Sequence, residues 1–231
     1  DTEGRHPLPD PAVFAEGMTR AGIGDGTLVV AYDDAGGVIA ARLVWMLRTL
    51  GEDAALLDGG LTGWGGPVET GPPGGSGSGV GGAGGAAPAF TPRPWPAGAL
   101  ATLEEVEAAA ADPAAGLVLL DARSRDRYEG TPDALDPRAG HIPGARSLPC
   151  RDHVDGHGRL LPDGELRSRL AGVGVTAGGP PVVSSCGSGV TACHTLLVLE
   201  QVGLPPGRLF AGSWSQWSRR DLPAVTGPAP R

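Results

Sequence analysis

The sequence predicts an α/β protein of two similar halves, each built on a parallel sheet with helices on both faces. Three observations support this fold class. Short apolar runs typical of buried strands alternate with longer helical patterns in the second half of the chain. The pattern of strand, loop, helix and strand that ends this half also occurs in the first half. A stretch rich in Gly, Pro, Ser and Ala, residues 69–98, separates the two and is typical of a linker that stiffens toward its proline-rich end.

The second half is expected to open with a helix, because Thr102 and Glu105 have the spacing of a capping box. This helix is expected to end near Ala111. The next run, "GLVLLDA", is short, apolar and typical of a buried strand. The elements expected after the first helix are a strand in 116–122, a helix in 162–175, a strand in 181–185, a helix in 190–203 and a strand in 207–210.

Residues 27–64 repeat the pattern of residues 180–217, which indicates a duplicated domain. The positions that coincide are Val29-Val30 with Val182-Val183, Asp33 with Cys186, and Trp64 with Trp217. Only the second copy has a thiol at the end of its strand. We therefore predict a non-catalytic domain in 1–68, a linker in 69–98 and a catalytic domain in 99–231.

Composition excludes several functional classes. The chain has 231 residues, 40% of them hydrophobic, which is enough to bury a core. Its formal net charge is −8 and it has no basic run, so nucleic acid and anionic membranes are not expected partners. No apolar run approaches the roughly 20 residues that cross a bilayer. The three cysteines are odd in number and argue against a disulfide framework, which favours a reducing, cytoplasmic location.

The loop "CGSGVT", residues 186–191, has the features of a site for a sulfur anion. It follows a strand at the carboxyl edge of the predicted sheet and precedes a helix N-terminus, where ligands bind in such folds. Glycines at 187 and 189 allow successive N–H groups to converge on one point, and Ser188 and Thr191 add hydroxyl groups. These features favour a thiolate at Cys186. The alternative is a buried structural cysteine in a tight turn.

Four stretches together resemble the two-domain sulfurtransferases of the rhodanese superfamily: "SSCGSGVTAC", "LLDARSRDRYEGT", "AGHIPGA" and "GSWSQW". The loop resembles the 3-mercaptopyruvate sulfurtransferase branch. The resemblance implies tandem rhodanese-like domains, each with a five-stranded parallel sheet flanked by helices, the second catalytic and the first degenerate. It also implies that a cysteine thiolate takes sulfur from a small-molecule donor as a persulfide. The sulfur then passes to a thiol acceptor such as thioredoxin, or to cyanide.

The resemblance also assigns residues to the site. Cys186 is the nucleophile, Ser188 the second catalytic group, and Arg127 the cation that holds the donor's anionic end, since a guanidinium pairs well with a carboxylate. Arg138 is a candidate for a second such cation, although its spacing differs from that in better-known relatives. The loop positions expected to bind the substrate are Gly187, Gly189, Val190 and Thr191.

Other residues near these motifs are expected to be structural. Asp121 and Arg123 should brace the end of a strand as a partly buried ion pair, and His141 should shape the turn into the next strand. Cys193 is expected in the core and Cys150 as an exposed thiol. No ligand spacing for a metal and no dinucleotide fingerprint is present, so we expect neither a metal nor a cofactor.

Two departures from the relatives matter. Ala211 stands where relatives usually have Asp before the Gly-Ser-Trp motif. In relatives, the segment "DTEGRHPLPDP" follows a "HIPGA" motif of the first domain. The first domain is therefore expected to lack its initial strands, which would leave "LVVAYD" with an unpaired apolar edge.

Three other functions are alternatives to this one. A phosphatase of related fold needs an arginine six residues after its cysteine, and here that position is Ala192. A non-catalytic sulfur carrier fits the first half, but the combination of Cys186 and Arg127 argues against it for the second. A thiosulfate:cyanide sulfurtransferase is the remaining alternative. Enzymes that prefer the thiosulfate dianion have basic residues inside the loop, and residues 187–191 have no charged side chain.

Overall fold

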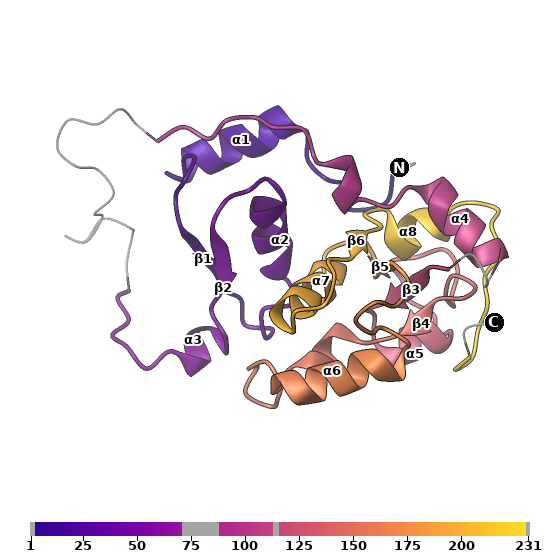
Figure 1. Ribbon diagram of the computed structural model, residues 1–231. Coiled ribbons are helices and arrows are strands. Elements are labelled where there is room, and N and C mark those ends of the chain that lie inside the picture. Colours follow the sequence, from indigo (N-terminus) through magenta and orange to yellow (C-terminus); the bar gives the residue numbers. More distant parts are fainter. Residues whose placement is uncertain (1–2, 71–87, 113–115, 230–231) are drawn as a thin grey trace.

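The computed structural model describes residues 3–70, 88–112 and 116–229. The chain forms two halves, with the N-terminal elements on one side and the C-terminal elements on the other (Figure 1). The N-terminal half contains α1 (Pro11–Arg20), β1 (Val29–Ala31), α2 (Ala41–Thr49), β2 (Ala54–Leu56) and α3 (Gly60–Gly63). The C-terminal half contains η1 (Ala97–Ala99), α4 (Leu103–Ala111), β3 (Val118–Asp121), α5 (Arg125–Glu129), β4 (Arg146–Ser147), η2 (Cys150–His153), α6 (Asp163–Gly172), β5 (Val182–Ser185), α7 (Ala192–Gln201), β6 (Arg208–Leu209) and α8 (Ser213–Trp217).

The C-terminal sheet is parallel, with the order β4-β3-β5-β6. Its two central strands, β3 and β5, are buried along their whole length, because helices cover both faces. The predicted α/β class is therefore confirmed. The expected five strands per sheet are not seen in the described residues. Beside β6, where a fifth strand would lie, there is a single parallel bridge between Leu100 and Leu209. Leu100 directly follows the turn η1, which ends at Ala99.

The N-terminal half has one parallel pair, β1 with β2, among its described residues. Leu28, Val30 and Tyr32 alternate along β1 and its flanks, and each is more than half exposed. An alternating apolar face of this kind is normally covered by other elements. Within the described residues β1 pairs with β2 alone, and this apolar face of β1 is uncovered.

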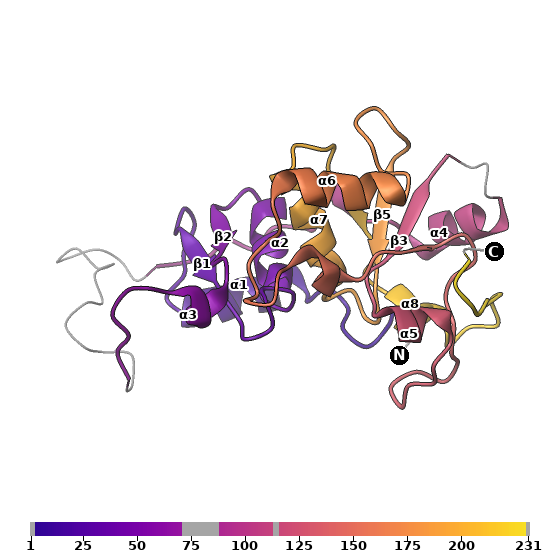
Figure 2. The same ribbon diagram turned by 90° about the horizontal axis from the view of Figure 1, so that it is seen from below.

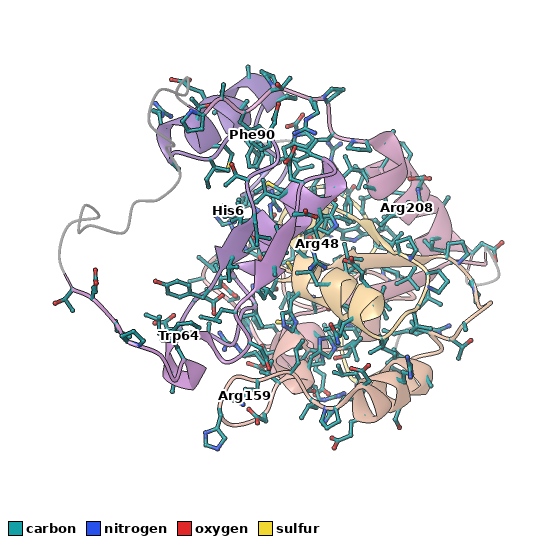
Figure 3. All side chains as sticks on the ribbon, turned by 60° about the vertical axis from the view of Figure 1, so that its left-hand side comes forward. His6, Arg48, Trp64, Phe90, Arg159 and Arg208 are labelled. Atoms are coloured by element: carbon teal, nitrogen blue, oxygen red, sulfur yellow. The ribbon has the colours of Figure 1, made fainter. Side chains whose placement is uncertain are left out.

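The repeat inferred from the sequence is visible in the order of elements. β1, a loop, α2, β2 and α3 follow one another as β5, a loop, α7, β6 and α8 do. The aligned tryptophans differ in environment. Trp217 is 1% exposed and donates its indole N–H to the Pro223 carbonyl, whereas Trp64 is 48% exposed and lies at the outer side of its half (Figure 3).

The two halves meet along α2 and α7, which pack against each other between the two sheets (Figures 1 and 2). Buried residues of both helices, such as Val44 and Leu197, belong to one continuous apolar cluster. The chain then returns along α1, where Phe90 packs edge-on against Phe14 and Trp95 donates to the Pro9 carbonyl. This second part of the predicted linker is therefore fixed to the N-terminal half, and residues 71–87 lie outside the described residues.

Candidate active site

Cys186 lies between the end of β5 and the start of α7, and is 2% exposed. The backbone N–H of Gly189 donates to its Sγ at 3.1 Å. Gly189 has φ +75°, and a Cβ at this position would overlap the Ala211 carbonyl oxygen. Only glycine fits here without strain, and it lets the loop bend back so that this amide faces the sulfur.

The loop is braced by the start of α8. The Cys186 N–H donates to Ser213 Oγ at 3.1 Å, and the N–H groups of Trp214 and Ser215 donate to the carbonyls of Cys186 and Gly187 at 3.0 and 2.8 Å. Ser213 has φ +51°, the one positive value among the described non-glycine residues. Strained backbone of this type persists where the surrounding structure determines it. The "GSWSQW" motif therefore acts as a backbone support for the sulfur loop.

The N-terminal segment reaches this loop, which the sequence reasoning did not foresee. His6 Nδ1 lies 2.8 Å from Ser188 Oγ, and Ser188 is itself buried. The N–H of the preceding Arg5 donates to Ser215 Oγ at 3.0 Å. His6 and Ser188 are separated by 182 positions. No local pattern in the sequence connects the two residues.

Arg127, on α5, faces the loop together with Arg5. A Cβ on Gly187 would lie 3.3 Å from the Nη2 atoms of both guanidinium groups. Arg127 Nε pairs with Asp133 at 2.6 Å, and Asp136 lies between Arg5 and Arg127 with a side chain that is 1% exposed. Two cations thus converge beside the loop, and each is paired with an acidic side chain. Arg5 was missed by the sequence reasoning.

A pocket of about 390 Å³ adjoins this region. Arg127 and Thr191 line it, together with Cys150 and the exposed Arg125 and Arg151. Val190, at the rim of the same loop, is half-buried. The pocket is large enough for a small carboxylic acid, and its walls carry more positive than negative side chains.

Arg138 does not join this cluster. Its guanidinium donates to four backbone carbonyls, those of Trp217, Ser218, Arg220 and Leu222, at 2.7 to 3.0 Å. The expected second cation is therefore corrected to a residue that fixes the chain after α8. Its donors are already used by these carbonyls.

Asp121, Arg123 and His141, which were expected to be structural, are all buried. Asp121 and Arg123 form a buried ion pair at 2.5 Å, and Arg123 also lies over the ring of Trp214. His141 is fully buried and stacks on Tyr128, with its Nδ1 at 2.8 Å from the Tyr128 carbonyl. Burial lowers the pKa of His141, so it is a neutral packing residue at neutral pH.

The two other cysteines are poor nucleophiles. Cys193 is fully buried, and burial raises its pKa. Cys150 is 5% exposed, which corrects the expectation of an exposed thiol, because it begins the turn η2 and packs into the apolar core. Burial raises its pKa to about 11, although a hydrogen bond with Thr191 acts in the opposite direction. Both remain protonated at neutral pH.

The loop of the N-terminal half holds a carboxylate where the second half has its thiol. Asp33 accepts from the N–H groups of Ala35, Gly37, Ile39 and Ala40 at 2.7 to 2.8 Å. Partial burial acts to raise the pKa of Asp33, but these four hydrogen bonds outweigh it and hold the pKa below its usual range. The loop is an anion-binding nest occupied by its own side chain.

Comparison with known proteins agrees with this arrangement. The rhodanese-like domain family matches residues 102–220. A "Probable 3-mercaptopyruvate sulfurtransferase" of Pseudomonas aeruginosa is 41% identical over 223 residues, which cover 93% of this chain and 72% of that protein. A thiosulfate sulfurtransferase of Rattus norvegicus is 32% identical, with 94% of this chain and 71% of that protein covered.

Among solved structures, the 3-mercaptopyruvate sulfurtransferase from Leishmania major superposes with a TM-score of 0.74 at 33% identity. The match covers 94% of this chain and 58% of that one. In the described part of this chain, none of the helices is both long and apolar enough to cross a bilayer.

Proposed function

Because the chain belongs to the rhodanese-domain sulfurtransferases, we propose that it moves sulfane sulfur from 3-mercaptopyruvate, through a persulfide on Cys186, to a thiol or to cyanide. The observation that carries this proposal is the juxtaposition of three features. The Cys186 sulfur lies in an uncharged loop, Ser188 and His6 lie beside it, and the cations of Arg127 and Arg5 face the same loop.

The donor's carboxylate binds to Arg127 and Arg5, which displaces part of their pairing with Asp136. The Cys186 thiolate then attacks the donor sulfur. The carbon–sulfur bond breaks, and its electron pair passes to carbon as the enolate of pyruvate. The enolate takes up the proton that leaves the transferred sulfur, so that the products are pyruvate and an anionic Cys186 persulfide.

Ser188 is placed to stabilise the charge that develops on the keto oxygen. If the Nδ1–H tautomer of His6 donates to Ser188 Oγ, the serine hydroxyl hydrogen is free to turn toward that oxygen. Contacts that strengthen as charge develops lower the barrier more than contacts that bind the ground state equally. His6 and Ser188 therefore act as one unit in the transfer step.

The second step returns the enzyme to its starting state. An acceptor thiolate attacks the outer sulfur of the persulfide, the sulfur–sulfur bond breaks, and Cys186 leaves as a thiolate. The N-terminal half contributes Arg5 and His6 to the site but supplies no nucleophile, since Asp33 stands where one would be. We assign residues 1–68 as the non-catalytic domain on this ground.

The test is mass spectrometry of the protein after incubation with 3-mercaptopyruvate and removal of the donor. One added sulfur atom is expected on the peptide that contains Cys186, and cyanide should remove it with release of thiocyanate. A protein that gains no sulfur from 3-mercaptopyruvate or thiosulfate would overturn the proposal.

A further inference from the structure

Arg42 connects the non-catalytic half to the sulfur loop. It lies in the first turn of α2, and its Nη1 donates to the Gly189 carbonyl at 2.6 Å. Its Nη2 donates to the carbonyls of His6 and Pro7 at 3.0 and 3.2 Å. One guanidinium thus holds two separate stretches of the site.

Both stretches carry groups that the reaction needs. The N–H of Gly189 is the donor to Cys186 Sγ, and the Gly189 carbonyl lies in the adjoining peptide plane, so holding that carbonyl fixes how the loop is turned. The backbone of His6 carries the imidazole that contacts Ser188. Arg42 therefore fixes the position of the Cys186 sulfur relative to the Ser188 side chain.

The position of Arg42 is fixed in turn by the Asp33 loop. The Asp33 carboxylate accepts from the N–H groups of Ile39 and Ala40, which lie just before the first residue of α2. Ala40 is the N-cap residue of α2, and its N–H is one of the donors that a helix N-terminus leaves without an intrahelical partner. The carboxylate thus anchors the turn of helix from which Arg42 extends.

We infer that Arg42 is a positioning residue for sulfur transfer, supplied by the non-catalytic half. Within the described residues, the hydrogen bonds of Arg42 all go to backbone carbonyls, so it acts through Gly189 and His6. The inference rests on the proposed function, but the geometry of the loop can be probed without sulfur transfer.

Arg48 provides a matched control. It lies on the same helix, donates to the Ala54 carbonyl at 2.6 Å, and pairs at 2.9 Å with Glu200 on α7 (Figure 3). Arg48 therefore also bridges the two halves, and none of its described contacts involves residues 186–191. Its replacement weakens the interface without changing the loop.

Arg42→Ala should lower kcat with 3-mercaptopyruvate by roughly tenfold or more, because a preorganised donor at a developing charge is misplaced. KM for the donor should change by less than about twofold, since Arg127 and Arg5 remain. Arg42→Lys, which can still donate to one of the carbonyls, should recover part of kcat. Arg48→Ala should keep kcat within about twofold of the parent protein.

The second measurement is the rate of Cys186 alkylation by iodoacetamide, followed by peptide mass analysis. Arg42→Ala should change this rate severalfold and Arg48→Ala should not. Equal kinetics for folded Arg42→Ala and the parent, or equal losses in both alanine variants, would overturn the inference. If the parent protein forms no persulfide but the alkylation rates still differ, the proposed function fails and the positioning role stands.

Discussion

The loops at Asp33 and at Cys186 occupy equivalent places in two copies of one strand-loop-helix unit, yet their backbone N–H groups have different partners. The Asp33 carboxylate accepts from four of them, whereas the structure records one amide donor, Gly189, on the Cys186 sulfur. A carboxylate fills its nest and makes a rigid turn. The Cys186 sulfur has one recorded amide donor, so its loop is not filled by its own side chain in this way.

The largest effect is expected from making the second loop resemble the first. Cys186→Asp should abolish turnover, because no nucleophilic sulfur remains, while the new carboxylate should be accepted by the loop. Steady-state assay and thermal unfolding measure the two effects. Cys193→Ser and Cys150→Ser should retain turnover, and a folded but inactive variant of either would contradict the assignment of Cys186 as the sole catalytic thiol.

The next effect concerns Arg127, one of the two cations that face the Cys186 loop. Arg127→Ala should reduce kcat/KM for 3-mercaptopyruvate by roughly two to three decades, since a lost charge-assisted contact costs on the order of 2 to 4 kcal/mol in the transition state. Arg169→Ala, which changes an exposed arginine on α6, is the control. The parent should prefer 3-mercaptopyruvate to thiosulfate, and the opposite order in parallel assays would contradict the donor assignment.

A smaller effect is expected on stability. Asp33→Asn should lower the free energy of unfolding at pH 7 by about 1 to 3 kcal/mol, because backbone donors lose a charged acceptor. The pKa of Asp33 is depressed in the folded protein, so its contribution is present above the ordinary carboxyl pKa and is lost as pH falls through the depressed value. Urea unfolding of both proteins should therefore differ at pH 7 and converge as the pH falls through the depressed pKa of Asp33. A difference that stays constant with pH would exclude this role.

The smallest effect is expected at the apolar edge of the first half. Val30→Lys should reduce self-association without changing kcat, because an exposed charge opposes pairing of strand edges. Light scattering over a concentration series measures this. Identical scattering for Val30→Lys and the parent protein would contradict the prediction.

The sequence allowed prediction of elements that carry their own signal. The capping box of Thr102 and Glu105 is present as expected. The elements α4, α7, β3 and β5 lie where the apolar periodicity and the positions of the glycines predicted them. Short elements such as α5, β4 and α8 were not predicted, because two to five residues give no readable period. In the part of the chain that the structure describes, the sheets have fewer strands than the resemblance implied.

The site was predictable only where one motif contains it. Cys186 and its loop follow from local residues and from the resemblance. Arg5, His6 and Arg42 reach the site from distant positions, and such contacts have no local signature. The burial of Cys150 could not be predicted, because it depends on tertiary packing alone. The role of Arg138 could not be predicted either, because no sequence pattern indicates the backbone carbonyls to which it donates.

The contact between His6 and Ser188 affects the order of events during folding. It joins residues 182 positions apart, so during synthesis His6 leaves the ribosome well before Ser188 and the site is completed only when Ser188 follows. Closing so long a loop is entropically costly and slow compared with forming helices. During refolding, the circular dichroism signal of the helices should therefore return before enzymatic activity does.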